Sequence, residues 1–87
     1  MSLTRCVLQN VHTLADFYRQ LHAQLPLPPH FGDNQDALWD ALTGDLPGPL
    51  EIVWKQPQLL GAAAEPLQEL LRDAAEERDD LCLYLLP

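Results

Sequence analysis

The chain has 87 residues, 47% of them hydrophobic, and a formal net charge of −8 at pH 7 from 13 acidic and 5 basic side chains. This length suits one small domain over residues 1–87 with a single core, and the hydrophobic fraction argues against a disordered chain. The negative charge argues against nucleic acid and anionic membranes as partners, because both would repel it. It favours either a basic protein partner or simple solubility.

The first segment shows no signal peptide, so we expect a cytoplasmic protein. Residues 4–8 predict a strand, and Thr13 begins a helix with Asp16 placed for an approximate capping box. Pro26 ends this helix. Its polar side is expected to carry Asp16, Arg19, Gln20 and Gln24, with His22 at the edge, and its apolar stripe to consist of Leu14, Phe17, Tyr18, Leu21 and Leu25.

A second helix is predicted over residues 34–43, after a loop stiffened by Pro28 and Pro29. Asp33 or Asn34 can cap its start, and Gly44 is expected to end it. Its inner face holds Ala37, Leu38, Ala41 and Leu42, and its outer face Asp36, Asp40 and Thr43, with Trp39 at the margin. Two like charges one turn apart cost a few tenths of a kcal/mol. Together with an exposed tryptophan, they indicate a surface made for a partner.

The second half of the chain predicts two more strands and a helix. Residues 50–55 read as a strand with Trp54 in the core, residues 57–64 are ambiguous, and a helix begins at Glu65 and Pro66. Residues 81–86 are so apolar that we expect burial on both faces of a sheet, with the first and last strands the most buried. The element order predicts an α/β fold, a three-stranded parallel sheet covered by three to four helices.

Metal binding and catalysis find little support in the sequence. Cys6 and Cys82 lie in apolar runs, so buried free thiols are expected, with a disulfide as the alternative. The three histidines show no ligand spacing, and the residues around Asn34 do not meet the calcium-loop pattern. Asp36 and Asp40 could act as an acid–base pair, but no pocket around them is indicated and no nucleophile motif occurs. We therefore expect no metal, no cofactor and no enzymatic activity.

The central segment Asp36-Ala37-Leu38-Trp39-Asp40, preceded by Gly32 and Asn34 and followed by Leu42-Thr43-Gly44, resembles the barstar family, intracellular inhibitors of the secreted ribonuclease barnase. Nearly the whole chain takes part in the resemblance. Further support comes from Pro49-Leu50, residues 51–54, Arg72 and Cys82. The resemblance implies the same parallel sheet covered by helices, and an acidic helix that plugs a ribonuclease active site with carboxylates where RNA phosphates would sit.

Carried over position by position, the resemblance implies a partner-binding surface with Asp40 as the principal phosphate mimic. Matching positions are Gly32, Asn34, Asp36, Trp39, Asp40, Thr43, Gly44 and Glu77, and Asp73 stands where the family prototype has a glutamate. Two further positions depart from the prototype: His30 replaces a tyrosine and Asp45 an aromatic residue. The segment between Trp54 and Leu71 is also shorter, which leaves the family's third helix open.

The sequence therefore leads to one hypothesis and one alternative. The hypothesis is a cytoplasmic inhibitor, or immunity protein, of a basic ribonuclease or ribonuclease toxin domain, acting as a monomer in a 1:1 complex. The alternative is a non-enzymatic interaction or regulatory module that kept the scaffold and no longer binds a ribonuclease. His30 and Asp45 are the residues that favour this alternative.

Overall fold

The computed structural model describes residues 3–87. The first segment, for which no signal peptide was expected, includes Met1 and Ser2, and these two residues lie outside the described part of the chain. The elements follow the order β1 (Thr4–Leu8), α1 (Leu14–Gln24), α2 (Gln35–Asp40), the π-helical turn η1 (Ala41–Asp45), β2 (Leu50–Lys55), the 3-10 segment η2 (Pro57–Ala63), α3 (Ala64–Glu77) and β3 (Leu81–Leu86). The three predicted strands are confirmed.

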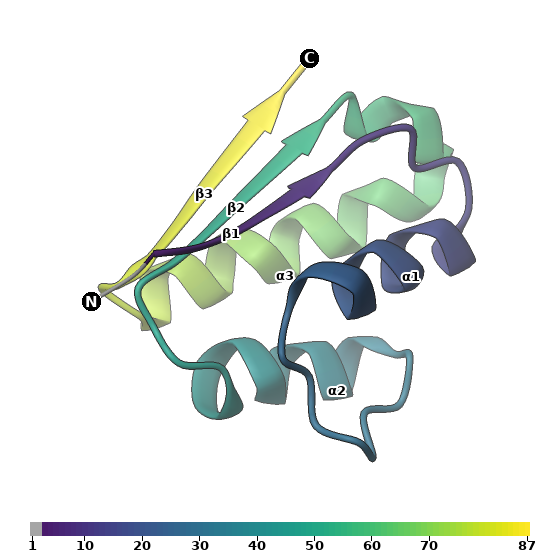
Figure 1. Cartoon of the computed structure of the whole chain (residues 1–87). Helices are drawn as coiled ribbons and strands as arrows, with labels where there is room; N and C mark the ends of the chain where they lie inside the picture. The colour runs from purple at the N-terminus through teal and green to yellow at the C-terminus, as the bar shows by residue number, and fades with distance from the viewer. Residues whose placement is uncertain (1–2) are drawn as a thin grey trace.

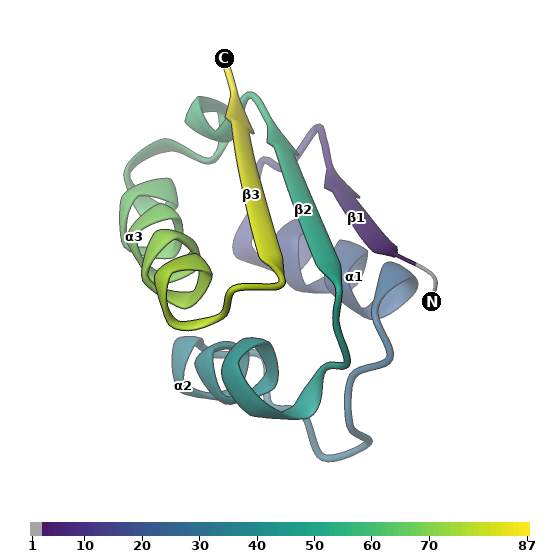
Figure 2. The ribbon, with the colours of Figure 1, turned by 90° about the vertical axis from the view of Figure 1, so that its left-hand side faces the viewer.

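One parallel sheet with the strand order β1-β2-β3 forms the centre of the fold, which confirms the predicted α/β class. In this register Cys6 lies beside Ile52, and Ile52 beside Leu83. Figures 1 and 2 show α1 and α3 against one face of the sheet, and α2 beyond the end at which the strands begin. No helix of residues 3–87 is long and apolar enough to cross a membrane.

The sheet is buried on one face only. Cys6, Ile52 and Trp54 point toward the helices and are fully buried, so the predicted core role of Trp54 is confirmed. On the other face Tyr84 is 49% exposed and Cys82 is also exposed. The predictions of a doubly buried last strand, of outer strands more buried than the middle one, and of a buried Cys82 are therefore wrong. An apolar run does not reveal that α1 and α3 both cover the same face of the sheet.

Both cysteines are free thiols, as expected. Burial raises the pKa of the Cys6 thiol to about 12, because a thiolate would lose its hydration in the core.

Helix α1 begins with the predicted capping box: the backbone N–H of Asp16 donates to Thr13 Oγ1 at 3.0 Å, and that of Thr13 to Asp16 Oδ2 at 3.3 Å. These bonds satisfy N–H groups that the first helical turn leaves unpaired. The helix buries Phe17, Tyr18 and Leu21, whereas Leu14 is 48% exposed, contrary to expectation. The buried stripe thus begins at Phe17.

Two glutamines of α1 pair with the free edge of β1. The amide of Gln24 accepts from the N–H of Val7 at 2.7 Å and donates to its carbonyl at 2.9 Å. Gln20 does the same for Gln9, at 3.1 and 2.8 Å. Both side chains are half-buried and lie at the margin of the polar side, where they stand in for a neighbouring strand and satisfy an edge that would otherwise be open.

The remaining helix boundaries differ from prediction by a few residues. The helical segment does not end before Gly44. After α2 it continues as η1, which includes Gly44 and is closed by a hydrogen bond from the Leu46 N–H to the Ala41 carbonyl at 2.9 Å. The ambiguous segment forms η2, interrupted at Gly61, where φ is 74°. Helix α3 begins at Ala64, one residue before the expected Glu65.

Candidate functional site

The loop before α2 is fixed by its own polar contacts. Asn34 caps the helix, as predicted, and its Oδ1 accepts the N–H of Ala37 at 2.8 Å. The N–H of Asn34 in turn donates to the carbonyl of Gly32 at 2.7 Å. A side chain at Gly32 would meet the Asn34 amide nitrogen at 3.1 Å. The small residue at Gly32 therefore keeps the cap in place.

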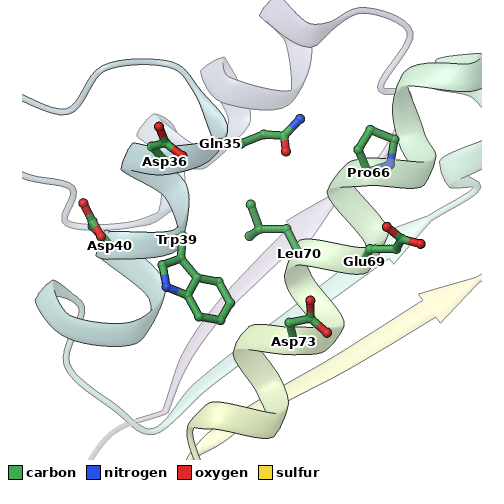
Figure 3. Close-up of a pocket in the computed structure, with 8 residues that line it drawn as sticks. All are labelled: Gln35, Asp36, Trp39, Asp40, Pro66, Glu69, Leu70 and Asp73. Atoms are coloured by element: carbon green, nitrogen blue, oxygen red, sulfur yellow. The ribbon is translucent and has the colours of Figure 1, made fainter.

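A groove of about 620 Å³ lies between α2 and α3 (Figure 3). Its lining residues come from both helices and are Gln35, Asp36, Trp39, Asp40, Pro66, Glu69, Leu70 and Asp73. The expectation that no pocket surrounds Asp36 and Asp40 is thus wrong, because α3 supplies the second wall. Glu69 and Leu70 are groove residues that the sequence analysis missed. The signal for Glu69 was the polar side of α3, on which Glu69 and Asp73 lie one turn apart, whereas Leu70 belongs to the apolar positions of that helix.

Trp39, on α2, lies between the two helices that line the groove. Its side chain is half-buried against the core, and Figure 3 shows the indole turned toward α3. The tryptophan is thus less exposed than the sequence suggested. One turn later, the Thr43 hydroxyl donates to the Trp39 carbonyl oxygen at 2.7 Å. The Thr43 proton is therefore engaged within the helix, and its oxygen remains as an acceptor.

His30 and Asp45, the two positions where the resemblance leads us to expect a departure, line a second, smaller cavity. This cavity of about 110 Å³ lies beside Asp40, and its lining residues are Pro28, His30, Phe31, Ala37, Asp40 and Asp45. His30 and Asp45 are 15 positions apart in the chain but flank the same carboxylate. Both side chains are exposed.

The carboxylates of the groove are not engaged in ion pairs within the described part of the chain. The ion pairs of residues 3–87 are Arg5–Glu51, Arg19–Asp16, His22–Asp33 and Arg78–Asp80. Asp36, Asp40 and Asp73 are exposed and stand outside all of these pairs. A groove lined by several negatively charged carboxylates attracts cations. No group of three or more metal-binding side chains occurs among the same residues.

The remaining predicted residues lie around this groove rather than in it. Gly32 and Asn34 belong to the loop before α2, and Gly44 lies in η1 with open space where a side chain would start. Glu77 is the exposed last residue of α3. The structure thus collects Asp36, Trp39, Asp40 and Asp73 in the groove.

Arg78 is a structural residue of the site that sequence reasoning missed. Its Nη1 donates to the carbonyls of Leu42 at 2.7 Å and Leu46 at 2.9 Å, while Nε and Nη2 donate to Asp80 at 2.9 and 3.1 Å. The hydrogen bond from Arg78 lowers the pKa of Asp80. An arginine at a helix end was visible in the sequence, but its carbonyl partners lie more than 30 residues away.

Comparison with known proteins agrees with this architecture. A sequence model of the family described as "Barstar (barnase inhibitor)" matches residues 1–86. A protein of Bacillus subtilis (strain 168) named "Putative ribonuclease inhibitor YrdF" is 37% identical over 76 residues, covering 83% of this chain and 80% of that protein. The chain belongs to the barstar family.

Proposed function

We propose that this protein inhibits a basic ribonuclease by inserting α2 and the loop before it into the active site. The observation that carries the proposal is the pair Asp36 and Asp40, exposed on α2 and outside the ion pairs of residues 3–87. Further support comes from the family, which is described as a barnase inhibitor, and from the name of the Bacillus relative.

The physical basis is charge mimicry. A ribonuclease binds RNA phosphates with cationic side chains, and carboxylates can take the same charge-assisted hydrogen bonds. Asp40 lies on both the groove and the small cavity, so we assign it the main contact. Asp36 and Asp73 line the groove beside it, and Glu77 adds charge at the end of α3. The net charge of −8 would speed association at low salt.

The remaining residues of the surface would contribute shape complementarity to the partner. Gly32, Asn34 and Gly44 present backbone close to α2, and Trp39 offers the exposed part of its indole to the partner. We assign His30, Thr43 and Asp45 to the rim. The inhibitor would act in the cytoplasm as a monomer in a 1:1 complex, protecting the cell as an immunity protein.

A second candidate function is an interaction module that has lost ribonuclease binding. One observation favours it: the two departures from the family pattern, His30 and Asp45, flank the same small cavity beside Asp40. A concerted change at one spot is the pattern expected when a partner changes.

The proposal is tested with small basic ribonucleases, including those encoded in the same genome. Stopped-flow experiments measure their association with this protein, and activity assays measure their inhibition. Asp40→Ala should weaken binding by about 2–5 kcal/mol, a range that derives in part from the barnase–barstar complex. Glu51→Gln removes one negative charge on the open face of the sheet, where Glu51 is paired with Arg5 at 2.7 Å, and serves as the control for net charge. This control should change the association rate only slightly.

Two results would contradict the proposal. One is that no such ribonuclease is bound at micromolar concentration. The other is that Asp40→Ala and Glu51→Gln weaken binding equally, which would indicate net charge rather than a specific contact. Recovery of an unrelated basic protein from the host, with no ribonuclease, would support the interaction module instead. Thermal unfolding of Asp40→Ala checks that the variant is folded.

A further inference from the structure

One face of the sheet, turned away from α1 and α3, has no helix of residues 3–87 against it (Figure 2). Because side chains alternate along a strand, those between the buried positions point to this open face. The open face consists of the strand residues Arg5, Val7, Glu51, Val53, Lys55, Cys82, Tyr84 and Leu86. Sheets whose strands are all parallel normally have both faces covered, so an uncovered one indicates a surface for another molecule.

The strand register arranges the open face in three rows that run across the strands. These rows are Arg5–Glu51–Cys82, Val7–Val53–Tyr84 and Lys55–Leu86. The middle row is apolar throughout, and each outer row combines charged and apolar side chains. Tyr84 and Leu86 are 49% and 42% exposed, so the face leaves large apolar side chains in contact with water.

The open face also differs in charge from the rest of the molecule. It carries two cations, Arg5 and Lys55, but only Glu51 of the 13 acidic side chains in a chain of net charge −8. Glu51 is paired with Arg5 at 2.7 Å, whereas Lys55 stands outside the ion pairs of residues 3–87. Two copies of the chain would repel one another across their acidic helices, and least across this face.

We propose that the open face binds a second copy of this chain, with the two sheets packed face to face about a two-fold axis that crosses the strands along the middle row. This axis lays the middle row on itself, so that Tyr84 packs near Tyr84 of the second copy. It also lays each outer row over the other, so that Glu51 faces Lys55 of the second copy. Each contact is made twice, and no like charges are opposed, as a self-complementary interface requires.

The area of the open face predicts a weak dimer. Strands of six residues, three of them side by side, give a face of roughly 300 Å² at about 3.3 Å per residue and 4.8 Å per strand. A standard interface buries about 800 Å² on each partner, so we expect a dissociation constant on the order of 0.1–1 mM. At micromolar concentration the chain is then monomeric, as the proposed 1:1 complex requires.

The inference does not depend on the proposed function. The acidic groove is lined by residues of α2 and α3, and none of them belongs to the open face. A ribonuclease would therefore find the groove free in the single chain. Failure to bind any ribonuclease leaves the inference intact, and absence of a dimer leaves the proposed function intact.

Sedimentation equilibrium and NMR of the wild type from about 20 μM to about 2 mM cover the expected dissociation constant. The average mass should rise from 9.8 kDa toward twice that value. Amide signals that shift with concentration should belong to residues of the open face, such as Val53 and Tyr84, whereas those of Asp36 and Asp40 stay in place. A constant mass of 9.8 kDa overturns the proposal, and so do shifts confined to α2 or α3.

An apolar variant with a matched control tests the middle row. Tyr84→Ser removes a side chain that is 49% exposed, and Leu14→Ser removes one of 48% exposure on α1. Because each dimer loses the tyrosine twice, Tyr84→Ser should raise the dissociation constant of the dimer about tenfold or more. Leu14→Ser should leave it within about twofold of the wild type. Equal effects overturn the assignment of the interface to the open face, and thermal unfolding checks that both variants are folded.

A charge variant tests the orientation of the two copies. Lys55→Glu places a carboxylate opposite Glu51 of the second copy and should weaken the dimer about three- to tenfold at low salt. Arg72→Glu makes the same change in net charge at an exposed position of α3 and should weaken it less than about twofold. Equal weakening by the two variants would show that net charge alone acts, which overturns the contact between Glu51 and Lys55.

Discussion

The guanidinium group of Arg78 donates a hydrogen bond to the backbone carbonyl of Leu42 at 2.7 Å, across 36 residues of chain. This contact joins the end of α3 to the segment that follows α2. The last carbonyls of a helix have no partner within it, and here an arginine side chain that is only 12% exposed supplies one. The two helices that form the acidic groove are thus tied together at one end by a single residue.

Loss of this arginine should destabilise the fold. Arg78→Met leaves two carbonyls without a donor, and we expect the free energy of unfolding to fall by roughly 2–4 kcal/mol. Urea unfolding measures the change. Arg72→Met removes an exposed arginine of α3 and should stay within about 0.5 kcal/mol of the wild type. Equal effects of the two variants would show that charge, and not the contact with Leu42, matters.

A side chain at Gly48 should be costly, because the Arg78–Asp80 pair occupies the space and would have to move. A Cβ at Gly48 would overlap Asp80 Oδ2 and lie 2.6 Å from Arg78 Nη2. Gly48→Ala must displace this pair, and we expect a loss of about 1–3 kcal/mol in thermal or urea unfolding. Gly44→Ala meets nothing within 4 Å and should be neutral or slightly stabilising, since it lies in a helical turn. A neutral Gly48→Ala would refute the close approach.

The stability of the β1 edge should depend on the hydrogen bonds that Gln24 makes to Val7. Gln24→Leu keeps the size of the side chain but leaves the N–H and C=O of Val7 without partners, at a cost of about 1–3 kcal/mol in the free energy of unfolding. Hydrogen exchange of the Val7 amide should also accelerate. Gln58→Leu, the same substitution at an exposed position of η2, is the matched control and should change neither quantity.

The two thiols should differ sharply in reactivity. Cys82 is exposed and should react with a disulfide reagent at pH 8, whereas buried Cys6, with its pKa raised to about 12, should react only after unfolding. The same shift predicts alkaline sensitivity. The ordinary pKa of a cysteine thiol is 9.0, so the stabilising contribution of the buried thiol is complete below pH 9 and is lost as the pH rises toward 12. In Cys6→Ala this part of the pH dependence should disappear from urea unfolding curves.

Local signals explain why much of the fold could be predicted. The capping box at Thr13 and Asp16, the cap at Asn34 and the alternating strand around Trp54 are readable within a few residues, and the structure confirms each of them. The boundaries that failed, such as the end expected at Gly44, lie where Arg78 donates to carbonyls more than 30 residues away, a contact that the local sequence does not reveal.

The candidate site was only partly readable for the same reason. The sequence by itself determined the acidic face of α2, because Asp36 and Asp40 follow helical spacing, and it determined the three parallel strands through their alternation with helices. Only the tertiary structure decided that α3 closes a groove with Glu69 and Asp73, and that His30 and Asp45 flank Asp40. It also decided that one face of the sheet stays open. Spacing along a chain specifies one element, whereas the contact of two elements depends on packing between residues far apart in sequence.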